Sequence, residues 1–270
     1  MTAIERCKAE IPISVSYGAG INSTAMLIGM YERGIIPDLI PFADVGKWLE
    51  APAEWPETYR FIDVFSEWLV KHSMPAVTVV RHKSDTLYES CIRNGTLPSK
   101  AYGFPGCAVK FKHQIIEGYE AQFFSEPKPV SPIYKAIGYH AGEDRGSGIT
   151  EKCRYRYRYF LKEWGWHQSH CIAAIERHGM KVPRKSSCWF CPSMKPHEIR
   201  ELAITHPLLM KKAIAMEHNA KPYHDVRGGH IKGLCRTYSF EQVVQASEAQ
   251  FHMFPEPDKM PCTCFDGEAG

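Results

Sequence analysis

The segment Cys188-Trp189-Phe190-Cys191-Pro192 holds two cysteines separated by two residues. Two thiolates at this spacing can chelate one metal centre, or they can act as a redox dithiol. Basic residues at positions 184, 185 and 195 favour the thiolate form electrostatically. Burial of both cysteines as small apolar residues is the third interpretation. The pattern therefore indicates a metal-binding or redox segment, with a structural cysteine pair as the alternative.

A metal site of four thiolates needs further ligands, and the chain has 10 cysteines in all. Cys107 follows a Pro- and Gly-rich loop, and Cys171 lies on a predicted helix whose apolar spacing also allows a core cysteine. Cys262 and Cys264 form a CxC pair that is the rival source of a ligand. Zinc and an iron–sulfur cluster are both compatible with such a set. We interpret the remaining cysteines as structural: Cys7, Cys91, Cys153 and Cys235.

The second chemically suggestive segment is the loop at residues 16–24, which reads Ser-Tyr-Gly-Ala-Gly-Ile-Asn-Ser-Thr. It lies between a predicted strand and a predicted helix, so backbone N–H groups and a helix N-terminus point at one place, which suits phosphate. Two glycines permit a close backbone approach, and Ser23 and Thr24 add hydroxyl donors. The segment matches neither GxxxxGK[ST] nor GxGxxG. An ordinary strand-to-helix turn is the alternative interpretation.

The elements that position these segments follow from the hydrophobic pattern. The predicted strands are residues 13–17, 39–45, 76–80 and 134–139, and the predicted helices of the same region are 23–33, 56–72 and 108–124. Strands that alternate with helices form parallel sheets, whose ligands bind at the carboxyl ends of the strands. Further helices are predicted at 167–178 and at 196–219, the latter broken near Pro207.

We therefore predict an α/β fold with a parallel sheet and flanking helices, together with a cysteine-containing helical C-terminal part. The predicted domains are a nucleotide-binding α/β domain over residues 1–150 and a helical, cysteine-rich, metal-binding part over residues 151–270. With 270 residues and 44% hydrophobic composition, the chain can bury a full core, which excludes wholesale disorder.

The formal net charge is +3, from 33 basic and 30 acidic residues, which is too small to indicate nucleic-acid binding by itself. No apolar run reaches the roughly 18 residues that a membrane span requires. The first residues, Met-Thr-Ala-Ile-Glu-Arg-Cys-Lys, lack the apolar core of a signal peptide. We therefore expect a cytoplasmic protein with no membrane partner.

Residues 18–23 resemble the PP-loop SGGxDS of the adenine-nucleotide α-hydrolase-like superfamily. This superfamily includes N-type ATP pyrophosphatases, tRNA sulfurtransferases and phosphoadenylyl-sulfate (PAPS) reductases. Three positions differ from the motif, with Gly18 for Ser, Ala19 for Gly and Asn22 for Asp. Because Asn22 removes a charge, the resemblance leaves open whether the loop cleaves ATP.

Further segments resemble the family in the same order along residues 10–220, and together they are more specific than any one of them. They are an acidic strand end at 42–46, a PET-type helix start at 56–59, the Cys-then-Lys motif of PAPS-reductase-like proteins at 106–112, and a second nucleotide-side loop at 137–145.

The resemblance implies residue roles at the matching positions. The implied nucleotide-binding residues are Ser16, Gly18, Ala19, Gly20, Asn22, Ser23, Thr24, Asp44, Gly138 and Arg145, and the implied catalytic residues are Cys107, Asp44, Lys110 and Lys112. Asp44 would contact the ribose or a Mg²⁺ ion, and the basic residues would offset phosphate charge. The implied ligand is ATP or another adenine nucleotide.

The run from Trp164-Gly165-Trp166 to Cys171, followed by residues 183–188, resembles a subgroup related to DNA phosphorothioation sulfurtransferases. Proteins of that subgroup carry a [4Fe–4S] cluster on four cysteines. The resemblance implies four metal ligands here, with zinc as the alternative metal: Cys107, Cys171, Cys188 and Cys191.

Residues 152–162 form a basic aromatic strip in which Arg154, Arg156 and Arg158 alternate with tyrosines. On a strand, the arginines would share one face, where they would contact phosphates while the aromatic rings stack on bases. The alternative is a solvated arginine face with the tyrosines packed on the core.

Three functions remain open. The first is an iron–sulfur sulfurtransferase that adenylates and then thiolates a nucleic-acid or nucleotide substrate, with DNA or tRNA and a sulfur-donor protein as partners. The second is a PAPS or APS reductase whose nucleophile is Cys107 or a thiol of the CxxC pair. The third is a zinc-stabilised nucleic-acid-binding module that uses the strip at 152–162.

Overall fold

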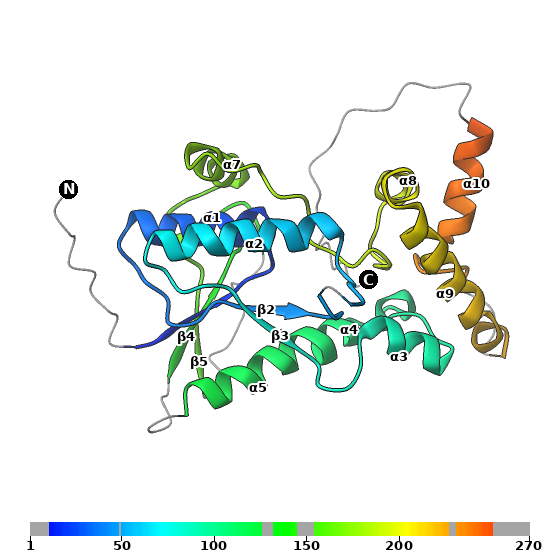
Figure 1. Cartoon of the computed structure of the whole chain (residues 1–270), viewed down its shortest axis with the longest axis horizontal. Helices are drawn as coiled ribbons and strands as arrows, with labels where there is room; N and C mark the ends of the chain where they lie inside the picture. Colours follow the sequence, from blue (N-terminus) through cyan, green and yellow to red (C-terminus); the bar gives the residue numbers. More distant parts are fainter. Residues whose placement is uncertain (1–10, 49, 126–131, 145–153, 227–230, 251–270) are drawn as a thin grey trace. The chain divides into compact units, whose positions relative to one another are not determined.

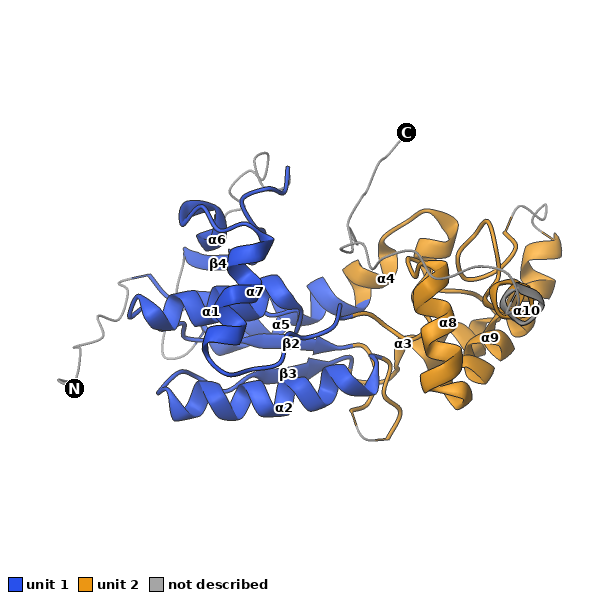
Figure 2. Ribbon diagram, turned by 90° about the horizontal axis from the view of Figure 1, so that it is seen from above, with its two compact units in different colours: residues 1–44, 54–82, 111–186 blue, residues 45–53, 83–110, 187–270 orange. Residues whose placement is uncertain are grey.

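The structure is a computed structural model that describes residues 11–48, 50–125, 132–144, 154–226 and 231–250. Unit 1 comprises residues 1–44, 54–82 and 111–186, and unit 2 comprises residues 45–53, 83–110 and 187–270 (Figure 2). This division differs from the predicted boundary at residue 150. Strand β5 (Tyr155–Arg158) belongs to unit 1 because it pairs with β4 (Ile133–Ile137).

The sheet of unit 1 confirms the predicted parallel α/β fold. Strand β1 (Ile13–Ser16) pairs with β4, and β2 (Pro41–Asp44) pairs with β3 (Thr78–Arg81), all in parallel. A parallel bridge between Ser14 and Leu39, with a bond of 2.9 Å from the N–H of Val15 to the carbonyl of Leu39, joins the two sets. The spatial order is therefore β3-β2-β1-β4-β5. It reverses between β1 and β4, which makes that pair the topological switch point.

Helices cover both faces of this sheet. Figure 1 shows α1 (Ile21–Glu32), α2 (Pro56–Lys71) and α7 (Gln168–Arg177) on one face, and α5 (Gln114–Phe123) on the other. Every residue of α1 from 23 to 30 is buried, because the helix packs against α7 as well as the sheet. The short helix α6 (Phe160–Glu163) follows β5.

The helix predicted at 108–124 is divided into three parts. A short helix α4 (Gly106–Ala108) and a π-helical turn η2 (Val109–His113) precede α5. π-helical turns are rare and occur frequently at functional sites. This turn carries both lysines of the Cys-then-Lys motif, Lys110 and Lys112.

Unit 2 is helical in the part that the structure describes. Its elements are α3 (Leu87–Asn94), the 3₁₀ turn η1 (Ser99–Tyr102), α4, α8 (Pro196–Thr205), α9 (Pro207–Val226) and α10 (Phe240–Gln250). The predicted break near Pro207 is confirmed, whereas α3 and α10 were not predicted. Helices α8, α9 and α10 pack on one another. The buried carboxylate of Glu217 on α9 accepts the N–H groups of Leu234 at 2.8 Å and Phe240 at 2.9 Å, which ties the start of α10 to α9.

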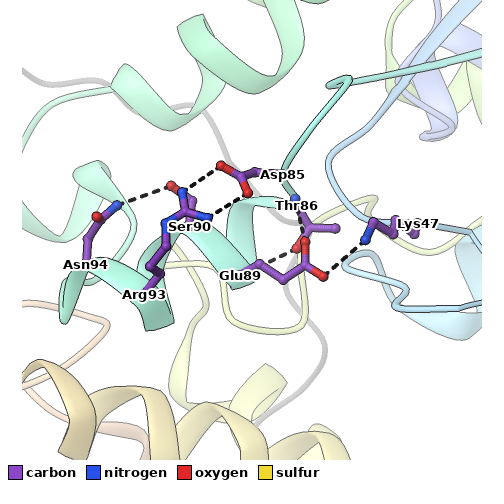
Figure 3. Close-up of polar contacts among 7 residues, drawn as sticks. All are labelled: Lys47, Asp85, Thr86, Glu89, Ser90, Arg93 and Asn94. Atoms are coloured by element: carbon purple, nitrogen blue, oxygen red, sulfur yellow. Dashed lines mark hydrogen bonds and ion pairs between the residues drawn. The ribbon is translucent and has the colours of Figure 1, made fainter.

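Helix α3 shows why a local sequence motif forms this element (Figure 3). Thr86 accepts the N–H of Glu89 at 3.0 Å, and Glu89 accepts the N–H of Thr86 at 3.0 Å, which completes a capping box. Arg93 pairs with Asp85 through two bonds of 2.6 and 2.7 Å, and Lys47 reaches Glu89 at 3.2 Å. These ion pairs are solvent-exposed on at least one side. Among the described residues, no helix has the length and apolar character needed to cross a membrane.

Candidate functional site

The loops that follow β1 and β4 meet at the switch point of the sheet. A Cβ atom added to Gly138, directly after β4, would lie 2.9 Å from the backbone nitrogen of Ser23 and 3.0 Å from its Cα. Only glycine allows this approach, so the loop after β4 rests against the first turn of α1. The structure thus brings together two segments, 16–24 and 138–144, that lie far apart in the sequence.

The loop after β1 presents backbone N–H groups at the start of α1. Ala19 has a φ of 56°, in the left-handed region, and its side chain is buried. Gly20 is the N-cap, and no described side chain caps the helix there. The Ser23 hydroxyl lies 3.3 Å from both the N–H of Gly18 and the carbonyl of Gly20, so it braces the turn. A helix N-terminus of this kind attracts anions.

Glu143 adds a carboxylate to this loop cluster. Its Oε1 atom accepts the side-chain amide of Asn22 at 2.8 Å and the backbone N–H of His140 at 3.2 Å. Nε2 of His140 lies 3.6 Å from the same oxygen. The sequence placed Glu143 in the second nucleotide-side loop without a role, whereas the structure gives it a direct bond to the first loop.

Asp44 lies at the carboxyl end of β2, next to β1 in the sheet. Its Oδ1 accepts the hydroxyl of Tyr59 at 2.8 Å, and that hydroxyl accepts the N–H of Glu54 at 3.2 Å. Asp44 is only 1% exposed. This burial favours a role in organising Tyr59 over direct contact with a ribose.

Lys112 is held by an acid that the sequence pattern did not indicate. Its Nζ lies 3.0 Å from Oε1 of Glu54, whose side chain is fully buried while that of Lys112 is 35% exposed. The hydroxyl of Ser186 donates to the other oxygen of Glu54 at 3.3 Å. Glu54 lies in an Ala-Glu-Trp stretch with no periodic signal, so only the fold reveals it.

An aromatic contact lies beside Glu54 in the sequence. The Arg184 guanidinium lies 3.3 Å from the ring centroid of Trp55 and 3.9 Å from Glu57. The segment that leads toward the CxxC pair is thereby fixed within unit 1 as far as Ser186.

The CxxC pair itself belongs to unit 2. The N–H of Cys191 donates to the carbonyl of Cys188 at 3.1 Å, so the pair forms a tight turn. Trp189 anchors this turn, with its backbone N–H 3.0 Å from the carbonyl of Ala53 and its indole N–H 2.8 Å from the carbonyl of Pro52. Cys191 is half-buried and Cys188 buried.

The other predicted metal ligands are divided between the units. Cys107 is half-buried on α4 in unit 2, and its N–H donates to the hydroxyl of Ser99. Cys171 is fully buried on α7 in unit 1, where burial and the charge of Glu143 raise the pKa of its thiol to about 12. Within the described residues, no three Cys, His, Asp or Glu side chains are placed to hold a metal ion. The four-cysteine site therefore stays a prediction.

Another thiol lies near the CxxC pair. Cys235, which the sequence analysis interpreted as structural, is buried and donates to the carbonyl of Met194 at 3.4 Å. Burial, with a smaller contribution from the charges of neighbouring groups such as Cys191, raises the pKa of Cys235 to about 12. Arg145, Cys262 and Cys264, all named as candidates from the sequence, lie outside the described residues.

The alternating part of the basic aromatic strip forms β5, which is the case that the sequence analysis considered without predicting a strand there. Arg154 donates to the backbone carbonyls of Glu120 at 3.2 Å and Ala121 at 3.4 Å. Arg158 pairs with Glu163 through two bonds of 2.5 and 2.7 Å. The tyrosine at 155 is buried and donates to Oε2 of Glu120 at 2.8 Å. These bonds favour the packed interpretation of the strip over a phosphate-binding face.

Comparisons with known proteins do not identify the ligand or the reaction of this site. No family profile matches the chain, and no curated protein matches it. Among solved structures it is similar to the U34-tRNA thiolase NcsA from Methanococcus maripaludis with its [4Fe-4S] cluster. That likeness has 15% identity, covers 96% of this chain and 86% of the other, and has a TM-score of 0.43. At these values it establishes neither family nor activity.

Proposed function

We propose that this chain is an adenine-nucleotide-dependent enzyme of the PP-loop type that transfers sulfur to a nucleic-acid or nucleotide substrate. The observation that carries the proposal is the packing of Gly138 on the first turn of α1 at the β1–β4 switch point. Ligands of open parallel sheets bind outside the carboxyl ends of the strands at such a switch point.

Phosphate fits this place for two reasons. The N-terminus of α1 carries partial positive charge, and the loop backbone is exposed at Gly18, whereas the hydroxyl-bearing Ser23 and Thr24 are buried. Lys112 adds a partly exposed ammonium group in the same unit, oriented by Glu54. The order of motifs along residues 10–220 points to an adenine nucleotide rather than another phosphate ligand.

The proposed reaction has two steps. A substrate oxygen attacks the α-phosphorus of ATP, the bond from that phosphorus to the bridging oxygen breaks, and pyrophosphate leaves. A hydrosulfide equivalent from a sulfur donor then attacks the substrate carbon that carries the adenylated oxygen. A C–S bond forms, the C–O bond breaks, and AMP leaves with that oxygen. The loop and Lys112 would stabilise the charge on the leaving phosphates.

A cluster on four cysteines would supply sulfur or hold it near the substrate. The described side chains do not form such a site, so no step above is assigned to a cluster. Among the described cysteines, Cys107 and Cys191 are the two that are not fully buried, and they are the thiols that a sulfur donor would reach first.

Sulfonucleotide reduction is the second candidate, because Asn22 stands where the PP-loop motif has an acid and Cys107 is half-buried. In that reaction the Cys107 thiolate attacks the sulfur of PAPS, and the bond from sulfur to the phosphate oxygen breaks. A reducing thiol then attacks the enzyme-bound thiosulfonate and releases sulfite.

Two assays on the same anaerobic preparation separate these functions. The first measures exchange of labelled pyrophosphate into ATP with tRNA, DNA or no acceptor present, and the second measures sulfite release from PAPS with a thiol reductant. Acceptor-dependent exchange supports sulfur transfer, and sulfite release supports reduction. A blank in both assays, with protein that is folded by circular dichroism, contradicts the proposal. Cys107→Ser should abolish sulfite release in the second case.

A further inference from the structure

We propose that an exposed surface of unit 2, centred on Phe104, binds a single strand of nucleic acid and stacks one of its bases. This surface, which we call the Phe104 surface, comprises the ring of Phe104 and the charged groups of Lys100, Lys232 and Arg236. The role of the strand as sulfur acceptor rests on the proposed function, but the binding itself can be measured without ATP.

Phe104 is an exposed aromatic residue on a turn of fixed geometry. It is 69% exposed, and its ring contacts no other aromatic ring among the described residues. Its N–H donates to the carbonyl of Ser99 at 3.3 Å, and Gly103 before it has a φ of 91° that ends η1. The Tyr102 hydroxyl lies 2.9 Å from Nε2 of His224, which ties η1 to α9. The backbone therefore presents the ring to solvent with little freedom left to lose on binding.

Positive charges surround this turn. A Cβ atom added to Gly103 would lie 3.2 Å from Nη1 of Arg236, so the guanidinium lies beside the residue that precedes Phe104. The carbonyl of Arg236 accepts the N–H of Lys232 at 2.8 Å, and Lys100 lies in η1 itself. All three cationic residues are exposed, and in the described part of the chain none of them forms an ion pair.

The segments that build the surface contain no acidic residue. None occurs at positions 90–116 or 231–240, although the whole chain has 30 acidic and 33 basic residues. The small net charge of +3 is therefore compatible with a positive potential over the Phe104 surface. An isolated apolar residue on a surface is ordinary, but an aromatic ring within an acid-free cationic surface favours an anionic ligand that also has apolar faces.

Arg236 gives a second, independent indication of a ligand. Its φ of 60° lies in the left-handed region, where a residue with a side chain is strained and glycine is not. Its side chain makes no hydrogen bond among the described residues, so no internal contact of the guanidinium offsets this strain. A ligand for the guanidinium explains an arginine at this position, whereas the fold alone favours glycine.

A single strand of nucleic acid fits these groups better than a protein or a duplex. Single strands are bound by cationic groups that contact phosphates and by aromatic rings on which bases stack. Lysine is depleted at protein–protein interfaces, and the bases of a duplex are already stacked on one another. Because base faces and phosphates are common to RNA and DNA, the surface should bind both.

The position of Cys107 connects this surface to sulfur transfer. Cys107 is half-buried three residues after Phe104, and its N–H donates to the hydroxyl of Ser99 in η1. A base stacked on Phe104 would therefore bring the strand beside one of the two described thiols that are not fully buried.

The test is a titration of the full chain, without ATP, into fluorescein-labelled oligomers followed by fluorescence anisotropy. The probes are oligothymidylate, oligouridylate and a duplex DNA, each about twelve nucleotides long. We expect both single strands to bind with similar affinity and the duplex to bind at least about tenfold more weakly. Affinity should fall as salt rises, with a logarithmic slope of about −0.7 for each phosphate contacted.

Two variants separate stacking from charge. Phe104→Ala should weaken single-strand binding about 5- to 150-fold and leave the salt slope unchanged. Arg236→Gly should weaken binding and reduce the slope by about 0.7, without lowering the melting temperature, because glycine relieves the strained backbone. A purely structural role for Arg236 predicts the opposite effect on melting and no change of slope.

The matched controls are Leu208→Ala and Lys212→Gln on α9. Leu208 is 72% exposed, and Lys212 is an exposed cation of the same unit. Both variants should bind single strands like wild-type protein. Thermal melting of every variant establishes that it is folded.

The outcomes distinguish this inference from the proposed function. If wild-type protein binds neither single strand, as expected when the surface serves a protein partner, the inference is wrong. Equal binding of duplex and single strand, or wild-type affinity in Phe104→Ala, also overturns it. Acceptor-dependent pyrophosphate exchange in the absence of strand binding would leave the proposed function standing. Strand binding as predicted, with no exchange for any acceptor, would support the surface and contradict the proposed function.

Discussion

The carboxyl edge of the sheet in unit 1 and the CxxC segment of unit 2 differ in how their chemical groups are held. In unit 1, parallel strand register brings the loops after β1 and β4 together, and Glu143, Asn22 and Gly138 interlock there. In unit 2, Cys188 and Cys191 share one turn, but the described residues around them complete no metal site. The first region is preorganised by backbone pairing, whereas Trp189 anchors the second through two hydrogen bonds.

The described ion pairs of the two units also differ in how deeply they are buried. Unit 1 buries the Lys135–Glu120 pair, with side chains 10% and 0% exposed, on the α5 side of the sheet. Glu120 also accepts the hydroxyls of Ser14 at 2.6 Å and Tyr155 at 2.8 Å. Among the described ion pairs of unit 2, each has at least one substantially exposed partner. Breaking the buried ion pair of unit 1 should therefore be strongly destabilising, whereas the exposed ion pairs of unit 2 contribute little to its stability.

The largest effect predicted from this contrast is the loss of stability when Lys135 is replaced. Lys135→Met leaves the buried Glu120 carboxylate without its counterion and should lower the free energy of unfolding by about 3–5 kcal/mol. The matched change Lys47→Met removes a surface partner of Glu89 and should cost less than about 1 kcal/mol. Urea denaturation measures both. Equal losses would show that the contrast between buried and exposed charge is wrong.

A substitution at Gly138 directly tests the preorganised carboxyl edge of the sheet in unit 1. Gly138→Ala places a Cβ 2.9 Å from backbone, so it should cost about 1–3 kcal/mol and also abolish measurable ATP binding. Gly118→Ala on α5, where no described atom lies within 4 Å of the new Cβ, should stabilise the protein by up to about 1 kcal/mol. Thermal melts and ATP titrations of the two variants give the comparison. ATP binding by Gly138→Ala at wild-type strength would remove this residue from the site.

The capping box of α3 tests local stability in unit 2. Thr86→Ala removes the oxygen that accepts the N–H of Glu89 and should cost about 1 kcal/mol. Thr205→Ala, in the last turn of α8 with an exposed hydroxyl, is the control and should be close to neutral. The urea concentrations at the midpoints of unfolding report the difference in stability, provided that the slope of the unfolding free energy against urea concentration is unchanged. A loss with Thr205→Ala as large as with Thr86→Ala would contradict the role of the cap.

The smallest predicted effect is a pH dependence in unit 2. Burial lowers the pKa of His224 from its ordinary 6.5, against the opposing charge of Asp225. The Tyr102 hydroxyl accepts the N–H of Leu97 at 3.0 Å and lies 2.9 Å from Nε2 of His224, which suits a neutral imidazole. Below about pH 6.5 the unfolded chain takes up this proton before the folded one, so stability falls as the pH falls.

Melting temperatures between pH 7.5 and 5.5 check this sign. His224→Gln removes the titrating group and should flatten the fall that wild-type protein shows over this range. A wild-type melting temperature that rises on acidification, with the Gln variant unchanged, would show that the sign assigned to His224 is wrong.

Sequence reasoning predicted the sheet of unit 1 well because its signals are local. Each short strand is an apolar run bounded by turn residues, and Gly138 and the loop at 16–24 fall at strand ends, where parallel sheets gather their ligands. Asp44 also lies at such an end, although its burial and its bond to Tyr59 were not visible from the pattern.

The remaining features depend on tertiary contacts that leave no periodic trace in the sequence. Glu54 and Glu143 acquire their roles only when Lys112 and Asn22 meet them across the fold. The pairing of β5 with β4 across residues 138–154, which places β5 in unit 1, is likewise a long-range event. The cysteine ligands stay predictions, since the spacing of cysteines along the chain does not fix which of their side chains meet in space.

Hydrogen exchange of the wild-type chain with and without magnesium-bound ATP tests the central claim most directly. The claim is that an adenine nucleotide binds at the carboxyl ends of β1 and β4. It predicts slower exchange on ATP addition in residues 17–24 and 138–144, with the helices of unit 2 unchanged. Protection confined to unit 2, or no protection at saturating ATP, would contradict it.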